Sequence, residues 1–304
     1  MASSAEPRQA ASQRSAGNGP RRDTPITRIG RGLAYLWHDP VLASGLALGA
    51  LLVVVAALGP LVWTASPFAI DVGSSLQPPS LTHPMGTDSV GRDLLARFDQ
   101  GARISLATGA IVVVVSALIG GAIGITAGYL GGWLDILLMR MIDAILAFPP
   151  LVLAMAVTVG LGVGVTTSAI GIILTAVPFY ARLLRSDVIR LKALPLIEAT
   201  AALGATRTRI MLRHILPHLV STLLIQAASV FGYAILSLAA LGFVGLGAQV
   251  PTPEWGTMIT NGLQYALTGQ WWIALFPGLG LLLAVTATSQ IADRGRDIFD
   301  PRSR

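Results

Sequence analysis

The sequence predicts an all-helical integral membrane protein with six transmembrane helices. Of its 304 residues, 53% are apolar and only 12% are charged, and the mean hydropathy is +0.69. Soluble domains carry about 25% charged residues, so this composition is typical of a chain that lies mostly in lipid. A spanning helix needs about 20 apolar residues, and six stretches qualify: Val41–Trp63, Ile104–Gly128, Leu134–Val159, Val165–Leu184, His218–Phe243 and Trp271–Ile291.

The distribution of basic residues predicts the orientation of these helices. Six spans place both termini on one side of the membrane, and cytoplasmic segments are enriched in Lys and Arg. If the termini are cytoplasmic, all but three of the 21 basic residues lie on their side. We therefore expect both termini in the cytoplasm, and we interpret the basic composition as a topology signal rather than a sign of nucleic-acid binding.

The region before the first span is predicted to lie outside the bilayer. Residues 1–27 are rich in Ala, Ser, Gly and Arg, a composition typical of a disordered tail. Residues 28–40 place Leu33, Leu36 and Trp37 among basic residues, which fits a short interfacial helix or a merely charged flank. The remaining chain is divided into a first span (residues 41–63), an external loop (residues 64–103) and a transmembrane core (residues 104–304).

The residue inventory excludes several kinds of chemistry. Cysteine is absent, so the chain has no disulfide, thiol nucleophile or thiolate metal site. The only lysine, Lys192, follows a leucine and not the glycine of a phosphate-binding Gly-Lys-Ser/Thr loop. The four histidines lack the spacing of a zinc site. We expect a transport protein with no catalytic residue, cofactor, metal or nucleotide site of its own.

The segment between the fourth and fifth spans predicts a helical finger on the cytoplasmic surface. Pro195 suits the first turn of a helix, where Glu198 is favoured by the helix dipole, and Gly204 can end that helix. Thr206 can cap a second short helix, and Pro217 then opens the fifth span. Small side chains leave a slim surface that another protein could approach closely. An ordinary cytoplasmic loop with a capped helix is the alternative.

This finger resembles the coupling motif of bacterial ABC importer permeases, which reads Glu-Ala-Ala, three residues, Gly, and later His-x-x-Pro or Leu-Pro. The resemblance implies a coupling helix that seats in a groove of an ATPase subunit. Thr200 replaces the second Ala of the motif, and Ala201 stands where Arg, a frequent basic contact, is common. The residues assigned to coupling are Glu198, Ala199, Thr200, Ala201, Leu203, Gly204, Ala205, His214 and Pro217.

Two further segments resemble the C-type permease of dipeptide, oligopeptide and nickel importers. One reads His-Pro-Met-Gly-Thr-Asp over residues 83–88 and continues with Gly-Arg-Asp at 91–93. The other includes Pro-Glu-Trp-Gly at 253–256, after prolines and glycines that prevent a helix and predict a shaped external loop. Local ion pairs are the first interpretation of the charges in the first segment, and contact with an external binding protein is the second. The candidate contacts are Asp88, Arg92, Asp93, Glu254 and Trp255.

Proline and glycine inside the spans predict where helices break and where they pack. Pro149 and Pro150 in the third span, and Pro178 in the fourth, remove backbone hydrogen bonds and should kink or break these helices. Broken helices are tolerated where protein covers them or where they line a cavity, so all three prolines are candidate pathway residues. A helix face that permits close packing is formed by Gly120, Gly124 and Gly128.

The rival class is a self-sufficient secondary transporter or channel. That class predicts ion-coupling charges at mid-membrane or inverted repeats between the two halves, and no half-to-half repeat is clear. Asp143 could be a proton or substrate site. Its nearness to Asp135 and Arg140 favours a structural ion pair instead.

Together these patterns predict a permease subunit with a fold like that of type I ABC importers, in a bacterial plasma (inner) membrane. The resemblance implies import of dipeptides or oligopeptides through a pathway of which this chain forms half, although nickel chelates and glutathione are carried by closely similar permeases. The implied partners are a second homologous permease, two ATPase subunits or domains that bind ATP and Mg²⁺, an extracytoplasmic substrate-binding protein and membrane lipid.

Overall fold

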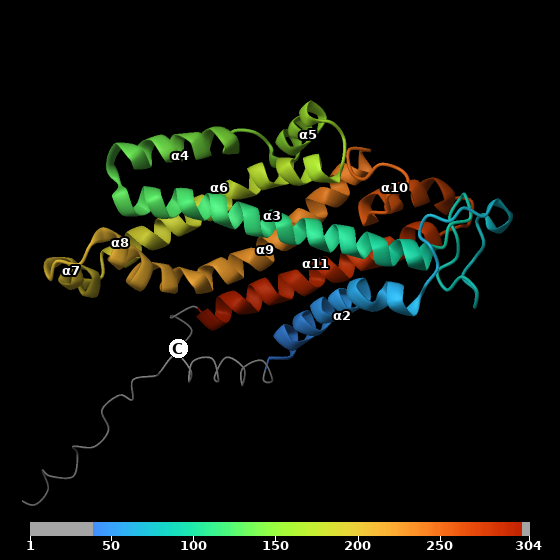
Figure 1. Ribbon diagram of the computed structural model, residues 1–304, viewed down its shortest axis with the longest axis horizontal. Coiled ribbons are helices and arrows are strands. Elements are labelled where there is room, and N and C mark those ends of the chain that lie inside the picture. Colours follow the sequence, from blue (N-terminus) through green and yellow to red (C-terminus); the bar gives the residue numbers. More distant parts are fainter. Residues whose placement is uncertain (1–38, 300–304) are drawn as a thin grey trace, which may run out of the picture.

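The computed structural model describes residues 39–299 as long helices that run along a common axis (Figure 1). Within that range the only strand-like pairing is an isolated bridge between Thr87 and Asp93, so the predicted all-helical class is confirmed. The predicted tail, residues 1–27, lies outside the described residues. So does the predicted interfacial helix, residues 28–40, except for Asp39 and Pro40.

Five helical segments of the described chain are long and apolar enough to cross a membrane. One of them, Arg207–Phe243, runs from α8 (Arg207–Ile210) through a π-helical turn (Met211–Ile215) into α9 (Leu216–Phe243). A sixth crossing is obtained when the bent pair α4 and α5 is counted as one span. The other four are α2 (Pro40–Val62), α3 (Leu94–Leu130), α6 (Val165–Lys192) and α11 (Trp272–Phe299).

The third predicted span is a broken helix. It consists of α4 (Gly132–Leu146) and α5 (Pro150–Leu161), whose axes differ by 87°. The predicted break at Pro149 and Pro150 is therefore confirmed. Of the kink or break predicted at Pro178, the break does not occur, because α6 continues through this buried residue. Close packing against other helices permits a proline within a membrane helix without ending it.

Several helix boundaries differ from the predictions. α6 and α11 each run eight residues beyond the predicted ends at Leu184 and Ile291. α3 begins at Leu94 and not at Ile104, because the Asp93 carboxylate caps its first turn by accepting the Ala96 amide at 2.8 Å. The last part of the predicted loop, residues 64–103, is therefore helical. An unpredicted helix, α10 (Trp255–Ala266), follows the segment in which prolines and glycines prevent a helix. At about 1.5 Å per residue, α3 is roughly 55 Å long and exceeds the hydrocarbon thickness.

The predicted glycine face of α3 packs against α6. A methyl group at Gly120 would lie 2.5 Å from the Val177 carbonyl oxygen, and one at Gly128 would lie 2.8 Å from the carbonyl oxygen of Arg185. A methyl group at Gly124 would collide with the Ala181 carbonyl. Each step of four residues on α3 matches a step of four on α6, so the two helices are parallel.

Two ion pairs attach α4 to α6. Arg185 donates to both carboxylate oxygens of Asp135, at 2.5 and 2.7 Å, and Arg182 donates to Asp143 at 2.7 Å. The structural role expected for Asp143 is supported, but the expected partner Arg140 is wrong. The actual partner lies on a neighbouring helix, which spacing along α4 cannot reveal.

The helices place two chemically different regions at opposite ends of the molecule (Figure 1). The finger formed by α7 (Pro195–Ala202) and α8 occupies one end, and the loop between α2 and α3 occupies the other. The start of α2 and the end of α11 lie towards the finger end. They are joined there by Asp39 and Arg294 at 3.4 Å, and by a 3.0 Å hydrogen bond from Ser44 to Gln290.

We predict that Gly124→Ala lowers the free energy of unfolding by about 1–3 kcal/mol, because the added methyl group overpacks the α3–α6 contact. Thermal unfolding of the purified protein measures this effect. Gly49→Ala is the matched control: it adds the same group to α2 where no atom lies within 4 Å. Equal melting temperatures for the two variants would contradict the prediction.

Candidate functional site

The finger has the helix start and end that its sequence predicts. Pro195 occupies the first helical position of α7, and Glu198 lies in its first turn. Gly204 has a φ of +84° and donates to the Ala201 carbonyl at 3.0 Å, while the Ala205 amide reaches the Thr200 carbonyl at 3.3 Å. These two bonds form a Schellman motif. The glycine therefore turns the chain sharply towards α8, which Thr206 caps through the Arg209 amide.

Buried side chains fix the finger on the bundle. In α7 only Ile197 is buried, and in α8 only Ile210. Both belong to one apolar cluster with the ends of α3, α6 and α9, so the base of the finger is packed while its tip is free. The members of this cluster are Tyr129, Leu184, Val188, Ile197, Ile210, Ile215 and Leu219.

The opposite surface of the finger is apolar and exposed. Leu196 is 65% exposed and Leu203 is 89% exposed, with the small exposed Ala199 between them on the same helical face. Glu198 is also exposed. Leu196 was not among the predicted coupling residues, although its spacing of three and seven residues from Ala199 and Leu203 is the signal that identifies it. An exposed leucine face of this kind is typical of a surface that docks another protein.

The remaining motif residues follow the finger, in the π-helical turn and at the start of α9. His214 is half-buried in the π-helical turn, and its carbonyl oxygen is 2.6 Å from His218 Nδ1. Pro217 lies at the start of α9. Lys192, at the base of the finger, donates to the Tyr129 carbonyl at 2.8 Å and lies 5.5 Å from the centre of the Tyr129 ring. The end of α3 is thereby tied to the segment that leads into the finger.

At the other end, a buried charge cluster orders the loop before α3. Asp88 accepts from Arg92 at 2.7 Å, as the ion-pair interpretation predicted, and it also lies 3.5 Å from Arg97, which was not predicted. Arg97 also donates to the carbonyl groups of Pro67 and Pro251, which belong to two different loops. This single side chain therefore joins the segment after α2 to the segment before α10.

Asp93 makes a second set of side-chain contacts that hold the same loop in place. Besides capping α3, its carboxylate accepts from Trp63 Nε1 at 3.0 Å and lies 2.8 Å from His83 Nδ1. Asp88 and Asp93 are both buried, and Arg92 is partly buried. These side chains hold the loop in shape, and little of their surface is left for contact with another protein.

Glu254 and Trp255 were predicted as contacts of an external binding protein, and the structure places both side chains at 0% exposure. Glu254 caps α10 through the amides of Gly256 and Thr257, and it accepts from Ser105 on α3. Burial raises the pKa of this carboxyl group. Trp255 donates to the Phe98 carbonyl and stacks on its ring. In this conformation both residues join α10 to α3, and neither is available to a binding protein.

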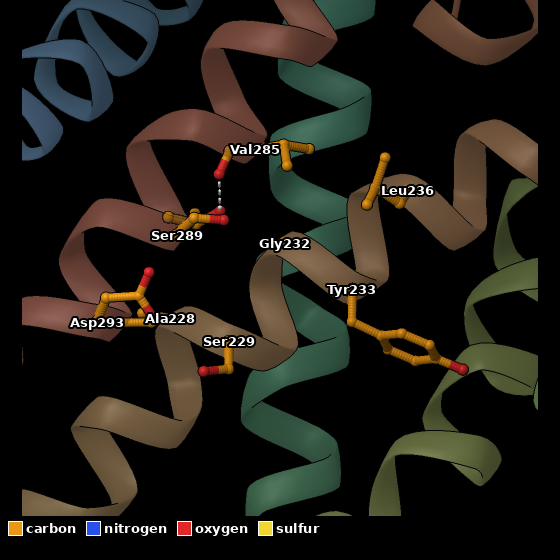
Figure 2. Close-up of a pocket in the computed structure, with 10 residues that line it drawn as sticks. Ala228, Ser229, Gly232, Tyr233, Leu236, Val285, Ser289 and Asp293 are labelled. Carbon is orange, nitrogen blue, oxygen red and sulfur yellow. Dashed lines mark hydrogen bonds between the residues drawn. The ribbon is translucent and has the colours of Figure 1, made fainter. Parts of the chain in front are cut away.

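A cavity of about 210 Å³ lies between α9 and α11 (Figure 2). Its lining combines small residues with hydroxyl groups from both helices, and Asp293 lies at one end. The missing side chain at Gly232 helps to keep the two helices close, because a methyl group there would lie 2.8 Å from Thr288 Oγ1. Polar lining between membrane helices is unsuited to lipid contact and is typical of a surface that faces water or protein. No pattern in the sequence predicts this cavity.

A multi-span helical bundle with a packed helical finger at one end and an ordered loop at the other is the architecture of a polytopic membrane subunit. A family described as the binding-protein-dependent transport system inner membrane component matches residues 120–304. The chain belongs to this family, whose members work with ATPase subunits and a substrate-binding protein. It is therefore a multi-pass inner-membrane permease subunit of an ABC importer and not itself an enzyme, and the resemblance inferred from the motifs is confirmed.

Two relatives and one solved structure illustrate the similarity. The chain is 40% identical to the dipeptide transport system permease protein DppC of Alkalihalophilus pseudofirmus, over 83% of each chain. It is 41% identical to the glutathione transport system permease protein GsiD of Escherichia coli, over 74% of each chain. An inward-facing structure of the MetNI methionine ABC transporter has a TM-score of 0.51 at 22% identity, and the match covers 67% of this chain and 97% of that one. This last likeness shows a shared fold.

We predict that Asp88→Asn lowers the free energy of unfolding by about 3 kcal/mol, because it leaves the buried guanidinium group of Arg97 and the partly buried one of Arg92 without this countercharge. Asp71→Asn is the control: it makes the same change on the exposed part of the loop, where Asn caps a turn as well as Asp does. Thermal unfolding of both variants checks this. A melting temperature for Asp88→Asn equal to that of the control would refute the structural role.

Proposed function

We propose that this chain is one of two permease subunits of an importer for short peptides. It forms half of the pathway, a second homologous permease forms the other half, and two ATPase subunits or domains bind ATP and Mg²⁺. An extracytoplasmic binding protein delivers the substrate. The observation that carries this proposal is the exposed leucine face of a rigidly anchored finger, in a chain that belongs to a binding-protein-dependent family.

The proposed mechanism begins at the finger. Nucleotide-driven closure of the ATPases moves the docked α7 helix, with Leu196 and Leu203 as apolar anchors and Ala199 allowing close approach. Because Ile197 and Ile210 attach the finger to the ends of α3, α6 and α9, this motion reaches the membrane helices directly. The helices then change between inward-open and outward-open arrangements by a rigid-body movement.

We assign the finger end of the molecule to the cytoplasm and the Asp88 end to the external side. The Lys and Arg distribution supports this orientation. So does the position of the start of α2 and the end of α11, which lie towards the finger end (Figure 1). Both termini are then cytoplasmic.

Two features are candidates for the pathway wall. The break between α4 and α5 at Pro149 and Pro150 interrupts backbone hydrogen bonding, which lipid does not tolerate unless protein or water covers it. The cavity between α9 and α11 offers hydroxyl groups and the Asp293 carboxylate. Pro178 is buried within α6 and is a weaker candidate.

The identity of the peptide is the second part of the proposal. Relatives named for dipeptides and for glutathione have almost the same identity to this chain. All of these substrates are short peptides, and we therefore propose this class. Purification of the complex with its binding protein, followed by mass spectrometry of the retained ligand, tests the class directly; a retained metal chelate without peptide would contradict it.

We predict that Leu196→Glu and Leu203→Glu each reduce co-purification of the ATPase and reduce transport by at least about tenfold, because a carboxylate would be buried at the docked surface. The melting temperature of the isolated chain should stay unchanged, since both leucines are exposed. Leu81→Glu, on the fully exposed part of the opposite loop, should leave ATPase binding intact. Full ATPase binding by both finger variants would contradict the assignment of this surface to docking.

The absence of cysteine from the sequence permits a direct test of orientation. We expect a membrane-impermeant thiol reagent to label Leu81→Cys in cells whose outer barrier has been removed, and to label Leu203→Cys only after the plasma membrane is permeabilised. The opposite pattern would place the finger outside and overturn the mechanism.

A further inference from the structure

Tyr180 lies where α3, α6 and α9 meet. Its side chain is 0% exposed and packs in a cluster with Val112 of α3 and Val230 of α9. Gly120 makes room for it, since a methyl group there would lie 2.8 Å from Tyr180 Cβ. The base of the tyrosine side chain therefore lies in the close contact between α3 and α6.

The hydroxyl group of Tyr180 is unusual. Among residues 39–299 it is the only buried side-chain polar atom that has no hydrogen-bond partner in the chain. Some buried hydroxyls donate to a carbonyl of their own helix, as Ser116 does to Val112 at 2.6 Å and Thr158 does to Ala154 at 2.8 Å. Others reach a neighbouring segment, as Ser105 reaches Glu254. A tyrosine hydroxyl is too far from its own backbone for this solution, and buried tyrosines normally find another partner.

A second tyrosine at the α6–α9 contact provides the contrast. Tyr233 of α9 directs its ring away from the cavity (Figure 2), and its hydroxyl lies 2.8 Å from Thr175 Oγ1 on α6. One tyrosine hydroxyl is thus paired in this conformation while the other is not. An unpaired buried hydroxyl disfavours a conformation by about tenfold or more relative to one in which it is paired.

The candidate partner is the Ser116 hydroxyl. Ser116 is fully buried and lies one turn before Gly120 on the same face of α3. Helical side chains lean towards the N-terminus of their helix, and α3 and α6 are parallel, so Tyr180 leans from the level of Gly120 towards Ser116. The serine hydroxyl already donates to Val112, and its oxygen can still accept a bond from tyrosine.

We propose that Tyr180 is a positioning residue of the transport cycle, whose hydroxyl donates to Ser116 in the second conformational state of the permease. This inference rests on the proposed alternation between two states. The α3–α6 contact is then close in both states, but the Tyr180 hydroxyl has a hydrogen-bond partner only in the second state. Loss of the Tyr180 hydroxyl removes the cost of an unpaired polar group from the present conformation. It removes a hydrogen bond to Ser116 from the second conformation.

The test uses the assembled importer in lipid nanodiscs, once without nucleotide and once trapped with ATP and vanadate. The melting temperature of each form is measured for Tyr180→Phe, for Ser116→Ala and for the double variant. We expect Tyr180→Phe to change the difference between the two melting temperatures and to slow transport several-fold. Ser116→Ala should change this difference in the same direction. The difference for the double variant should equal that for Tyr180→Phe alone, because the Ser116–Val112 bond is lost from both forms.

Tyr233→Phe is the matched control. It removes a hydroxyl that is paired in the present conformation, so it cannot favour that conformation by releasing an unpaired group. Equal shifts of both forms by Tyr180→Phe, or additive effects of the two single variants, would overturn the Tyr180–Ser116 bond. The melting temperatures do not depend on substrate. Failure of the wild-type complex to import peptides would therefore count against the proposed function and not against this inference.

Discussion

The close parallel contact between α3 and α6 is the constraint on which the rest of the structure depends. Gly120, Gly124 and Gly128 of α3 meet backbone carbonyl groups of α6, so at these three positions the helices lie too near each other to accept even a methyl group. α3 extends from the charge cluster at Asp93 to Tyr129 beneath the finger, and α6 leads into the finger through Lys192. The two ends of the molecule are therefore connected by one packed pair of helices.

The features that could be predicted from the sequence are those that depend on residues close together in the chain. Apolar stretches predicted most of the spans, and the small residues of α3 predicted its packing face. The limits of the finger's first helix were predicted by Pro195, Glu198 and Gly204. The break at Pro149 and Pro150 was also local. Each of these depends on the backbone of a few adjacent residues, which is why the patterns were sufficient.

What could not be predicted depends on residues far apart in the chain. Arg97 within the first turn of α3 made that segment look like an external loop, although the charge is neutralised by Asp88 and by carbonyl groups of two other loops. Asp143 is paired across to Arg182. Glu254 and Trp255 looked like an exposed signature, but α3 covers them. Burial is a property of the assembled bundle and not of the motif.

The single lysine has a consequence of its own. Lys192 stands at the base of the finger, and its ammonium group is the only side-chain amine in the sequence. A lysine-specific protease would therefore have one place to cut, between the fourth and the fifth membrane segments. If the proposed ATPase docks on the finger, it would also shield this peptide bond, so resistance to such a protease would report whether the ATPase is bound.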